Sequence, residues 1–194
     1  KRKTLTMAIR CKHSDIYSTW FCTFTCCNWL NLFEITNSYD LVYNWFSVLK
    51  TKCNSDVVAY VIMPNHLHCI LYFKEAGFNL NKIISNGKRF MAYEIIRRLE
   101  QSEDSTILKL LSEAVTERER KKGQLHKVFK DSFDAKAIFS NKFLHQKIDY
   151  IHYNPVSGKW QLVNNYTDYE HSSASFYELN VHKHFVPLHY KDAW

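Results

Sequence analysis

The sequence is poor in the two residues that most often interrupt regular structure: its 194 residues include only four glycines and three prolines. This scarcity argues against a disordered chain and against an all-β fold dense in tight turns. Hydrophobic residues make up 46% of the chain and aromatic residues 15%, which is enough to build a hydrophobic core. Because this length is typical of one compact unit, we expect a single domain over residues 1–194.

Long hydrophobic runs are also missing. No stretch approaches the roughly 18 apolar residues of a membrane span, and no secretory signal appears, so we expect a soluble, cytoplasmic protein with no membrane partner. The 26 Lys and Arg residues outnumber the 19 Asp and Glu residues, which gives a formal charge of +7. A basic balance favours a polyanionic partner such as nucleic acid, although it says nothing about the fold.

The sequence contains six cysteines but no Cys-x-x-Cys pair. Cys22, Cys26, Cys27 and Cys69 lie in hydrophobic, strand-like runs. Cysteines in such runs usually act as small buried hydrophobic residues, and the cytosol keeps them reduced. We therefore expect buried thiols, with a Cys/His zinc site as the weaker alternative.

The hydrophobic pattern predicts strands at residues 20–27, 57–63 and 66–73, and a short further strand at 127–133. Helical spacing predicts helices from Ser38 to about residue 52, from Asn79 or Asn81 to about residue 99, and over 141–153 after Ser140. Gly87 interrupts the second helix, where we expect a bend or break. Residues 101–125 read as a charge-dense helix or loop. This order of elements predicts an α+β fold with an antiparallel central sheet flanked by helices.

Two histidines open the third predicted strand. His66 and His68 project from the same face of a strand, while Leu67 points to the core. Two neutral imidazoles can bind one divalent ion. Taken alone, however, a His-x-His pair is more often a solvent-facing pair at a strand edge, and a metal site needs a third ligand.

Tyr150 and Asn154 lie four residues apart on the last predicted helix and therefore on one face of it. If that face met the histidines, Tyr150 would be a nucleophile and the amide oxygen of Asn154 a third metal ligand. A phenol, with a pKa of about 10, attacks a phosphodiester poorly unless a base or a cation assists it. The chain has 12 tyrosines, so a core tyrosine is the simpler interpretation of Tyr150, and Tyr153 is a rival on the same helix.

Together, the two motifs resemble those of the single-tyrosine HUH transposases, of the REP-associated tyrosine transposase type, which are relatives of single-strand insertion-sequence transposases. The matching stretches are Tyr60-Val61-Ile62-Met63-Pro64-Asn65-His66-Leu67-His68-Cys69-Ile70, Tyr150-Ile151-His152-Tyr153-Asn154-Pro155-Val156 and Tyr169-Glu170-His171-Ser172-Ser173. The resemblance covers about residues 17–177 and leaves an aromatic C-terminal tail at 178–194. The chain departs from the family at Ser157-Gly158-Lys159-Trp160, where a basic residue, Ala and Gly are usual.

The resemblance implies a ferredoxin/RRM-like HUH fold. It implies His66, His68 and Asn154 as ligands of Mg²⁺ or Mn²⁺, and Tyr150 rather than Tyr153 as the catalytic residue. The corresponding activity is that of a transposase, a metal-dependent endonuclease and strand transferase that acts on single-stranded or hairpin DNA through a phosphotyrosine intermediate. Such an enzyme is expected as a monomer or a homodimer. Two alternatives remain open: a non-catalytic protein that binds DNA hairpins with the same fold, and an unrelated metal hydrolase with an acidic third ligand.

Basic residues on and after the second predicted helix are candidates for phosphate contacts, with a solvated helix face as the equally weighted alternative for each. These candidate DNA-binding residues are Lys82, Lys88, Arg89, Arg118, Arg120, Lys121, Lys122, Lys127 and Lys130.

Overall fold

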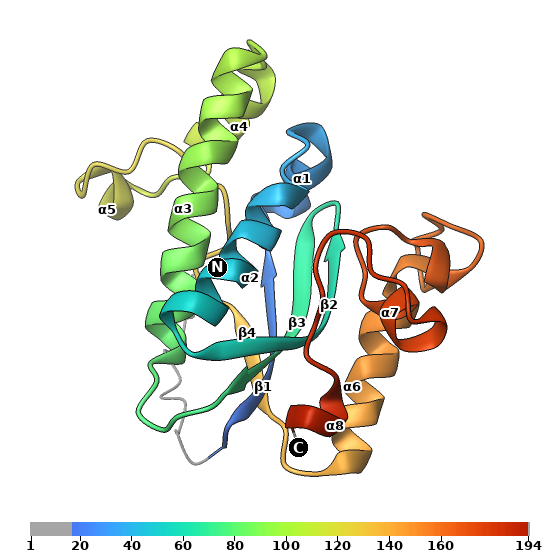
Figure 1. Cartoon of the computed structure of the whole chain (residues 1–194). Coiled ribbons are helices and arrows are strands. Elements are labelled where there is room, and N and C mark those ends of the chain that lie inside the picture. The colour runs from blue at the N-terminus through green and yellow to red at the C-terminus, as the bar shows by residue number, and fades with distance from the viewer. Residues whose placement is uncertain (1–16, 194) are drawn as a thin grey trace, which may run out of the picture.

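The computed structural model describes residues 17–193, and a four-stranded antiparallel sheet lies at its centre. The strands β1 (Thr19–Thr25), β2 (Ser55–Met63), β3 (His66–Phe73) and β4 (Asp134–Ala137) follow the order β2-β3-β1-β4 (Figure 1). The predicted fold class and the first three strands are confirmed, with small differences at the strand ends. Cys11 and Trp194 lie outside the described residues.

The prediction of a strand over 127–133 was wrong, because the fourth strand is β4. Within 127–133, the only bridge that the structure records to β1 and its neighbouring residues pairs Phe129 with Cys26. Val128 and Phe129 are hydrophobic because they fill the core, where they are 3% and 7% exposed. Their pattern therefore reports burial and not strand pairing.

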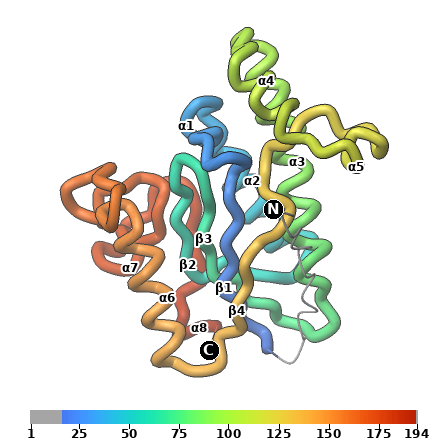
Figure 2. The backbone as a smooth tube through the Cα atoms, turned by 180° about the vertical axis from the view of Figure 1, so that it is seen from behind, coloured from blue at the N-terminus to red at the C-terminus, as the bar shows by residue number. Residues whose placement is uncertain are grey.

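Helices cover both faces of the sheet, as the front and back views show together (Figures 1 and 2). On one face α2 (Tyr39–Lys52) and α3 (Leu80–Gln101) bury the larger hydrophobic core. On the other face α6 (Asn141–Tyr153) packs over a smaller core. The remaining helical segments are η1 (Cys27–Trp29), α1 (Leu32–Ile35), α4 (Ser105–Glu113), α5 (Glu117–Arg120), η2 (Asn154–Val156), η3 (Tyr166–Asp168), α7 (Ala174–Leu179) and α8 (Tyr190–Ala193).

The alternation of side chains along β3 divides the two cores. Leu67, Cys69 and Leu71 face α2 and α3, while Ile70 faces α6. His66 and His68 share the face of Ile70 because side chains two residues apart point the same way. The four cysteines that the sequence placed in the core are indeed buried and free.

Gly87 does not interrupt α3, which runs without a break over Leu80–Gln101 after the Asn79 cap. The expected bend is absent because Gly87 has a packing role. A Cβ atom at this position would lie 2.5 Å from Nε1 of Trp45 on α2. Glycine thus allows the Trp45 ring to reach the α3 backbone.

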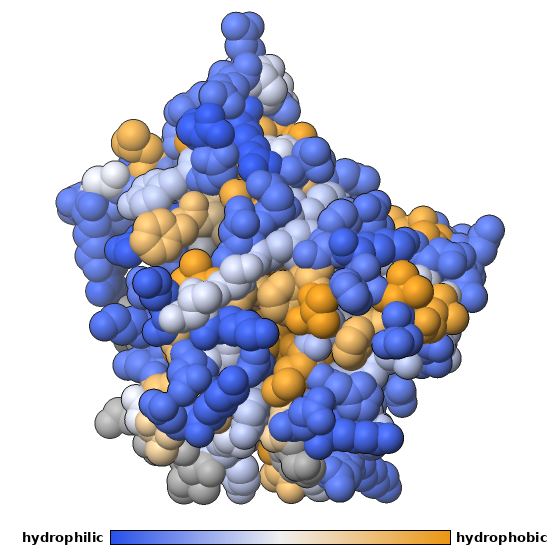
Figure 3. All heavy atoms as spheres, in the orientation of Figure 1, coloured by the Kyte–Doolittle hydropathy of each residue, from blue (hydrophilic) through white to orange (hydrophobic). Residues whose placement is uncertain are grey.

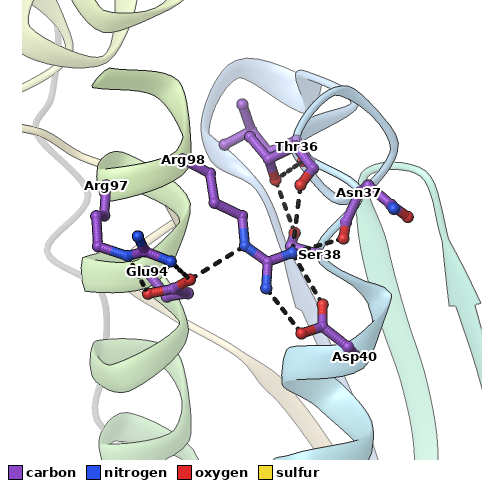
Figure 4. Close-up of polar contacts among 8 residues, drawn as sticks. Thr36, Asn37, Ser38, Asp40, Glu94, Arg97 and Arg98 are labelled. Carbon is purple, nitrogen blue, oxygen red and sulfur yellow. Dashed lines mark hydrogen bonds and ion pairs between the residues drawn. The ribbon is translucent and has the colours of Figure 1, made fainter. Parts of the chain in front are cut away.

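Arg98 ties α3 to the start of α2 (Figure 4). Its guanidinium donates two hydrogen bonds to the Asp40 carboxylate, at 2.9 and 2.7 Å, and one to the carbonyl oxygen of Asn37 at 2.6 Å. Glu94, one turn earlier on α3, accepts from Nε of Arg98 at 3.2 Å. Paired, planar contacts of this kind fix orientation better than single ones.

Residues 101–125, expected as a helix or loop, contain α4 and α5, and Figure 1 shows α4 beyond the end of the sheet. Among residues 17–193, no helix is both long and apolar enough to cross a membrane. The front surface is mostly hydrophilic, with hydrophobic side chains gathered near its centre and right (Figure 3).

The C-terminal segment covers the outer edge of β2. The backbone N–H of Ile62 donates to His171, and that of Ser173 donates to Tyr60, at 2.8 and 2.9 Å. The hydroxyl of Ser173 also hydrogen-bonds to Nε2 of His152 on α6, at 2.9 Å. The Tyr-x-x-Ser-Ser motif therefore closes a sheet edge and fastens α6 beside β2.

Candidate active site

His66 and His68 lie at the start of β3 and are only 6% and 5% exposed. The interpretation of the pair as solvent-facing is therefore wrong. Their rings meet edge to face, with centroids 4.7 Å apart. Two buried imidazoles at the end of a hydrophobic sheet face require partners for their polar atoms.

Each histidine uses Nδ1 for a hydrogen bond within the protein. Nδ1 of His68 lies 2.6 Å from Oγ1 of Thr23, and Nδ1 of His66 lies 2.7 Å from Oδ1 of Asn65. Thr23 can reach His68 because the two residues are paired across β1 and β3. An amide oxygen only accepts, so Nδ1 of His66 carries the proton and Nε2 keeps its lone pair.

Burial keeps both imidazoles neutral. It lowers the pKa of His66 to about 4, against a smaller opposite effect of Asn154. It also lowers the pKa of His68 well below its ordinary value, with further contributions from His66 and the ammonium of Lys147. Neutral imidazole is the form that binds metal ions.

Asn154 follows α6 directly and begins η2. Its Oδ1 is buried without a hydrogen-bond partner, an exception that only Oγ1 of Thr19 shares among the buried side-chain N and O atoms of residues 17–193. The side chain nevertheless lies near enough to His66 to affect its pKa. A buried acceptor without a partner beside two imidazole nitrogens fits a divalent cation, because nitrogen and amide oxygen donors suit Mn²⁺ and, less well, Mg²⁺.

Tyr150 faces the histidines. Its hydroxyl oxygen lies 3.4 Å from Nε2 of His68, and its ring meets those of His68 and Phe21 edge to face. Tyr153 is equally exposed, but its ring lies against Tyr166, with centroids 4.3 Å apart. Helix α6 therefore turns Tyr150 toward the site and Tyr153 toward the loop after η2.

Lys147 is a member of the site that the sequence did not reveal. Its ammonium lies 4.7 Å from the centre of the Phe21 ring and 5.3 Å from that of Tyr150. The spacing of three residues from Tyr150 on one helix was the available signal. Thr23 and Asn65 were missed as well, because their contacts depend on strand pairing and on the turn before β3.

Two alternatives find no support in the described part of the chain. Nowhere in residues 17–193 do three or more His, Cys, Asp or Glu side chains group in a way that could hold a metal ion. This speaks against a Cys/His zinc site and against a hydrolase with an acidic third ligand there.

The candidate phosphate-binding residues separate into several groups. Lys88, Arg89, Lys122 and Lys130 line one groove between α3 and residues 122–131. Within it, Lys88 donates to the carbonyl oxygens of Lys130 and Asp131, and burial lowers its pKa to about 8. Lys88 therefore holds the groove wall together.

Five candidates lie outside the residues that line this groove. Lys127 pairs with Glu119 at 2.7 Å and with Asp131 at 2.9 Å. Arg120 donates to the carbonyl oxygen of Ser112 at 2.6 Å. The others are Lys82 on α3, Arg118 on α5 and Lys121 directly after α5.

The sheet, the flanking helices and the His-x-His strand beside α6 give the chain an α+β fold of the HUH-like type. A similar solved structure is that of a REP-associated tyrosine transposase bound to a REP hairpin. It matches with a TM-score of 0.55 and 21% sequence identity, over 86% of this chain and 82% of that one. No protein-family model and no curated protein sequence matches the chain. The likeness is therefore one of fold.

Proposed function

We propose that this protein is a metal-dependent endonuclease and strand transferase, of transposase type, that acts on single-stranded DNA through a covalent phosphotyrosine at Tyr150. The observation that carries the proposal is the position of the Tyr150 hydroxyl, 3.4 Å from Nε2 of His68. The unpartnered Oδ1 of Asn154 supports the metal site, because it offers a third donor beside the two histidines.

The chemistry is a transesterification. The phenol oxygen of Tyr150 attacks the scissile phosphorus and loses its proton, while the bond from phosphorus to one sugar oxygen breaks and that oxygen takes up a proton. A DNA hydroxyl can later attack the phosphotyrosine and restore a phosphodiester, so joining needs no ATP. A divalent ion bound by His66, His68 and Asn154 would polarise the scissile phosphate and stabilise its charge.

Hairpin DNA is the proposed partner. The formal charge of +7 and the groove lined by Arg89, Lys122 and Lys130 favour a polyanion. The solved protein of similar fold is bound to a REP hairpin. A hairpin with unpaired flanks offers both a duplex and the accessible single strand that the nucleophile requires.

The test is incubation with end-labelled hairpin DNA and Mn²⁺, followed by denaturing electrophoresis. We expect a covalent adduct that disappears in Tyr150→Phe and persists in Tyr153→Phe. These variants form a matched pair, because the two tyrosines are 48% and 47% exposed on the same helix.

Each other outcome points elsewhere. Loss of the adduct only in Tyr153→Phe would move the nucleophile to Tyr153. Tight hairpin binding without an adduct, across a broad hairpin library, would favour a non-catalytic hairpin-binding protein. Cleavage without an adduct would indicate a hydrolase.

A further inference from the structure

Two tryptophans flank His66, one on each side of β3. The Trp29 ring lies 6.3 Å from the His66 ring and the Trp160 ring 6.2 Å from it, between centroids. Trp29 belongs to η1, directly after β1, and Trp160 follows α6 and η2. Because β1 and β2 lie on opposite sides of β3, and α6 packs over β2, the two rings approach the site from opposite directions.

Each tryptophan carries a lysine. The ammonium of Lys130 lies 4.0 Å from the centre of the Trp29 ring, and that of Lys159 lies 5.2 Å from the centre of the Trp160 ring. The Lys130 backbone is anchored to the end of β1, where its N–H donates to the carbonyl oxygen of Thr25. Lys159 is close enough to His66 to contribute to its lowered pKa. A ring with an adjacent cation presents a surface for a base and a charge for a phosphate.

The backbone of Trp29 is held in an unusual conformation. Asn28 and Trp29 have φ angles of +53° and +59°, in the left-handed region that bulky residues rarely adopt. The side chain of Asn65 holds this segment by donating to the carbonyl oxygen of Trp29 at 3.0 Å, while its Oδ1 hydrogen-bonds to His66. One amide therefore positions both the candidate metal ligand and a tryptophan that remains 54% exposed. Strain that keeps a large apolar ring in solvent beside a site indicates a binding role.

Trp160 belongs to the stretch Ser157-Gly158-Lys159-Trp160, where this chain departs from the family pattern. Gly158 has a φ of +63°, and the N–H of Trp160 donates to Ser157 at 3.1 Å, so the stretch forms a tight turn. That turn directs Trp160 back toward His66.

We propose that the pairs Trp29–Lys130 and Trp160–Lys159 bind the unpaired nucleotides on either side of the phosphodiester that Tyr150 attacks. Each ring stacks on a base and each lysine contacts a phosphate. The pairs select single-stranded DNA because a base within a duplex has no free face to stack on. This inference deepens the proposed function and rests on it for the position of the scissile phosphate.

The test measures binding in EDTA, so that it does not depend on cleavage. The probe is a hairpin with unpaired flanks that carry 2-aminopurine, titrated with the full chain. We expect Trp29→Ala and Trp160→Ala each to weaken binding roughly 5- to 100-fold and to abolish the fluorescence change of one flank, whereas the Phe variants retain most of both. A fully paired duplex should bind all these variants alike.

The lysines give a second measurement that does not depend on the tryptophan variants folding. Lys130→Gln and Lys159→Gln should each lower the slope of log affinity against log salt by about 0.7, the value for one phosphate contact on a single strand. Lys52→Gln is the matched control, because Lys52 is exposed on α2, across the sheet from the site. Unchanged salt slopes and unchanged 2-aminopurine signals would overturn the inference even if the Tyr150 adduct forms. Tryptophan-dependent binding without an adduct would instead retain the nucleotide site and refute the proposed catalysis.

Discussion

The hydroxyl oxygen of Tyr150 lies 3.4 Å from Nε2 of His68, although the two residues are 82 positions apart in the chain. Regular elements hold both residues: β3 carries His68, and α6 carries Tyr150. The buried face of α6 packs on the sheet, and the hydrogen bond between His152 and Ser173 fastens the helix to the segment that covers β2. A nucleophile and a candidate ligand placed on packed elements need little reorganisation before reaction.

Asn154→Ala should weaken Mn²⁺ binding by at least about tenfold, because it removes the third donor. The metal-free protein should keep its free energy of unfolding. Its Oδ1 is buried without a partner, and removing such a group recovers a desolvation cost of about 1–3 kcal/mol, which offsets the lost contacts. Electron paramagnetic resonance of free Mn²⁺ and urea unfolding in EDTA measure the two quantities.

Asn44→Ala is the control for this variant, because Asn44 is exposed on α2 and should affect neither quantity. Unchanged Mn²⁺ affinity in Asn154→Ala would remove Asn154 from the metal site. A large loss of stability in EDTA would mean that its side chain has a structural partner instead.

Lys147→Gln should slow formation of the Tyr150 adduct about tenfold, or roughly 1.4 kcal/mol in the barrier. The ammonium lies 5.3 Å from the centre of the Tyr150 ring, where its charge attracts the scissile phosphate. Lys147→Arg should retain most of the rate. Lys142→Gln, an exposed position near the start of the same helix, serves as the control. Single-turnover adduct formation at low salt measures the effect, and equal rates in the two Gln variants would contradict it.

The helices and the first three strands could be predicted because their side-chain patterns are local. β4 could not, since its residues Asp-Ala-Lys-Ala include no β-branched or aromatic side chain. Its position depends on pairing with β1, and strand preference follows such context more than composition. Gly87 was misread for a related reason: its role is set by Trp45 on another helix.

The candidate site shows the same division. Spacing placed Tyr150 and Asn154 on one helix face, and the family resemblance joined them to the histidines. The support around them could not be predicted, because Thr23 reaches His68 across 45 positions through the pairing of β1 with β3. Burial of the histidines also follows from the packing of α6, which one strand alone does not reveal.

His171 predicts a loss of stability in acid. Its ring stacks on Tyr39, Nδ1 bonds the hydroxyl of Tyr43 at 2.9 Å, and burial lowers its pKa to about 4 from an ordinary value of 6.5. A folded-state pKa below the unfolded one means that this stability is complete above pH 6.5 and decreases as the pH falls toward 4.

We expect wild type to lose about 1 kcal/mol more than His171→Gln between pH 7.5 and pH 5, after allowance for solvent screening of a partly exposed group. Urea unfolding at the two pH values measures the difference. The ion pair of Glu170 with His184 adds its own acid dependence in both proteins, so the comparison isolates His171. Parallel pH profiles would refute the assignment.

Gly87→Ala should destabilise the protein by about 1–3 kcal/mol, against the usual gain when alanine replaces glycine inside a helix. The new methyl group would lie 2.5 Å from Nε1 of Trp45, a rigid side chain that is only 8% exposed and cannot easily move away. Thermal and urea unfolding measure the change. Trp45→Phe should lose stability on its own, but the double variant Gly87→Ala/Trp45→Phe should lose less than the sum of the two, because the smaller ring makes room for the methyl group. Additive losses, or a stabilised Gly87→Ala, would show that the contact between α2 and α3 is looser than the packing of Trp45 on Gly87 indicates.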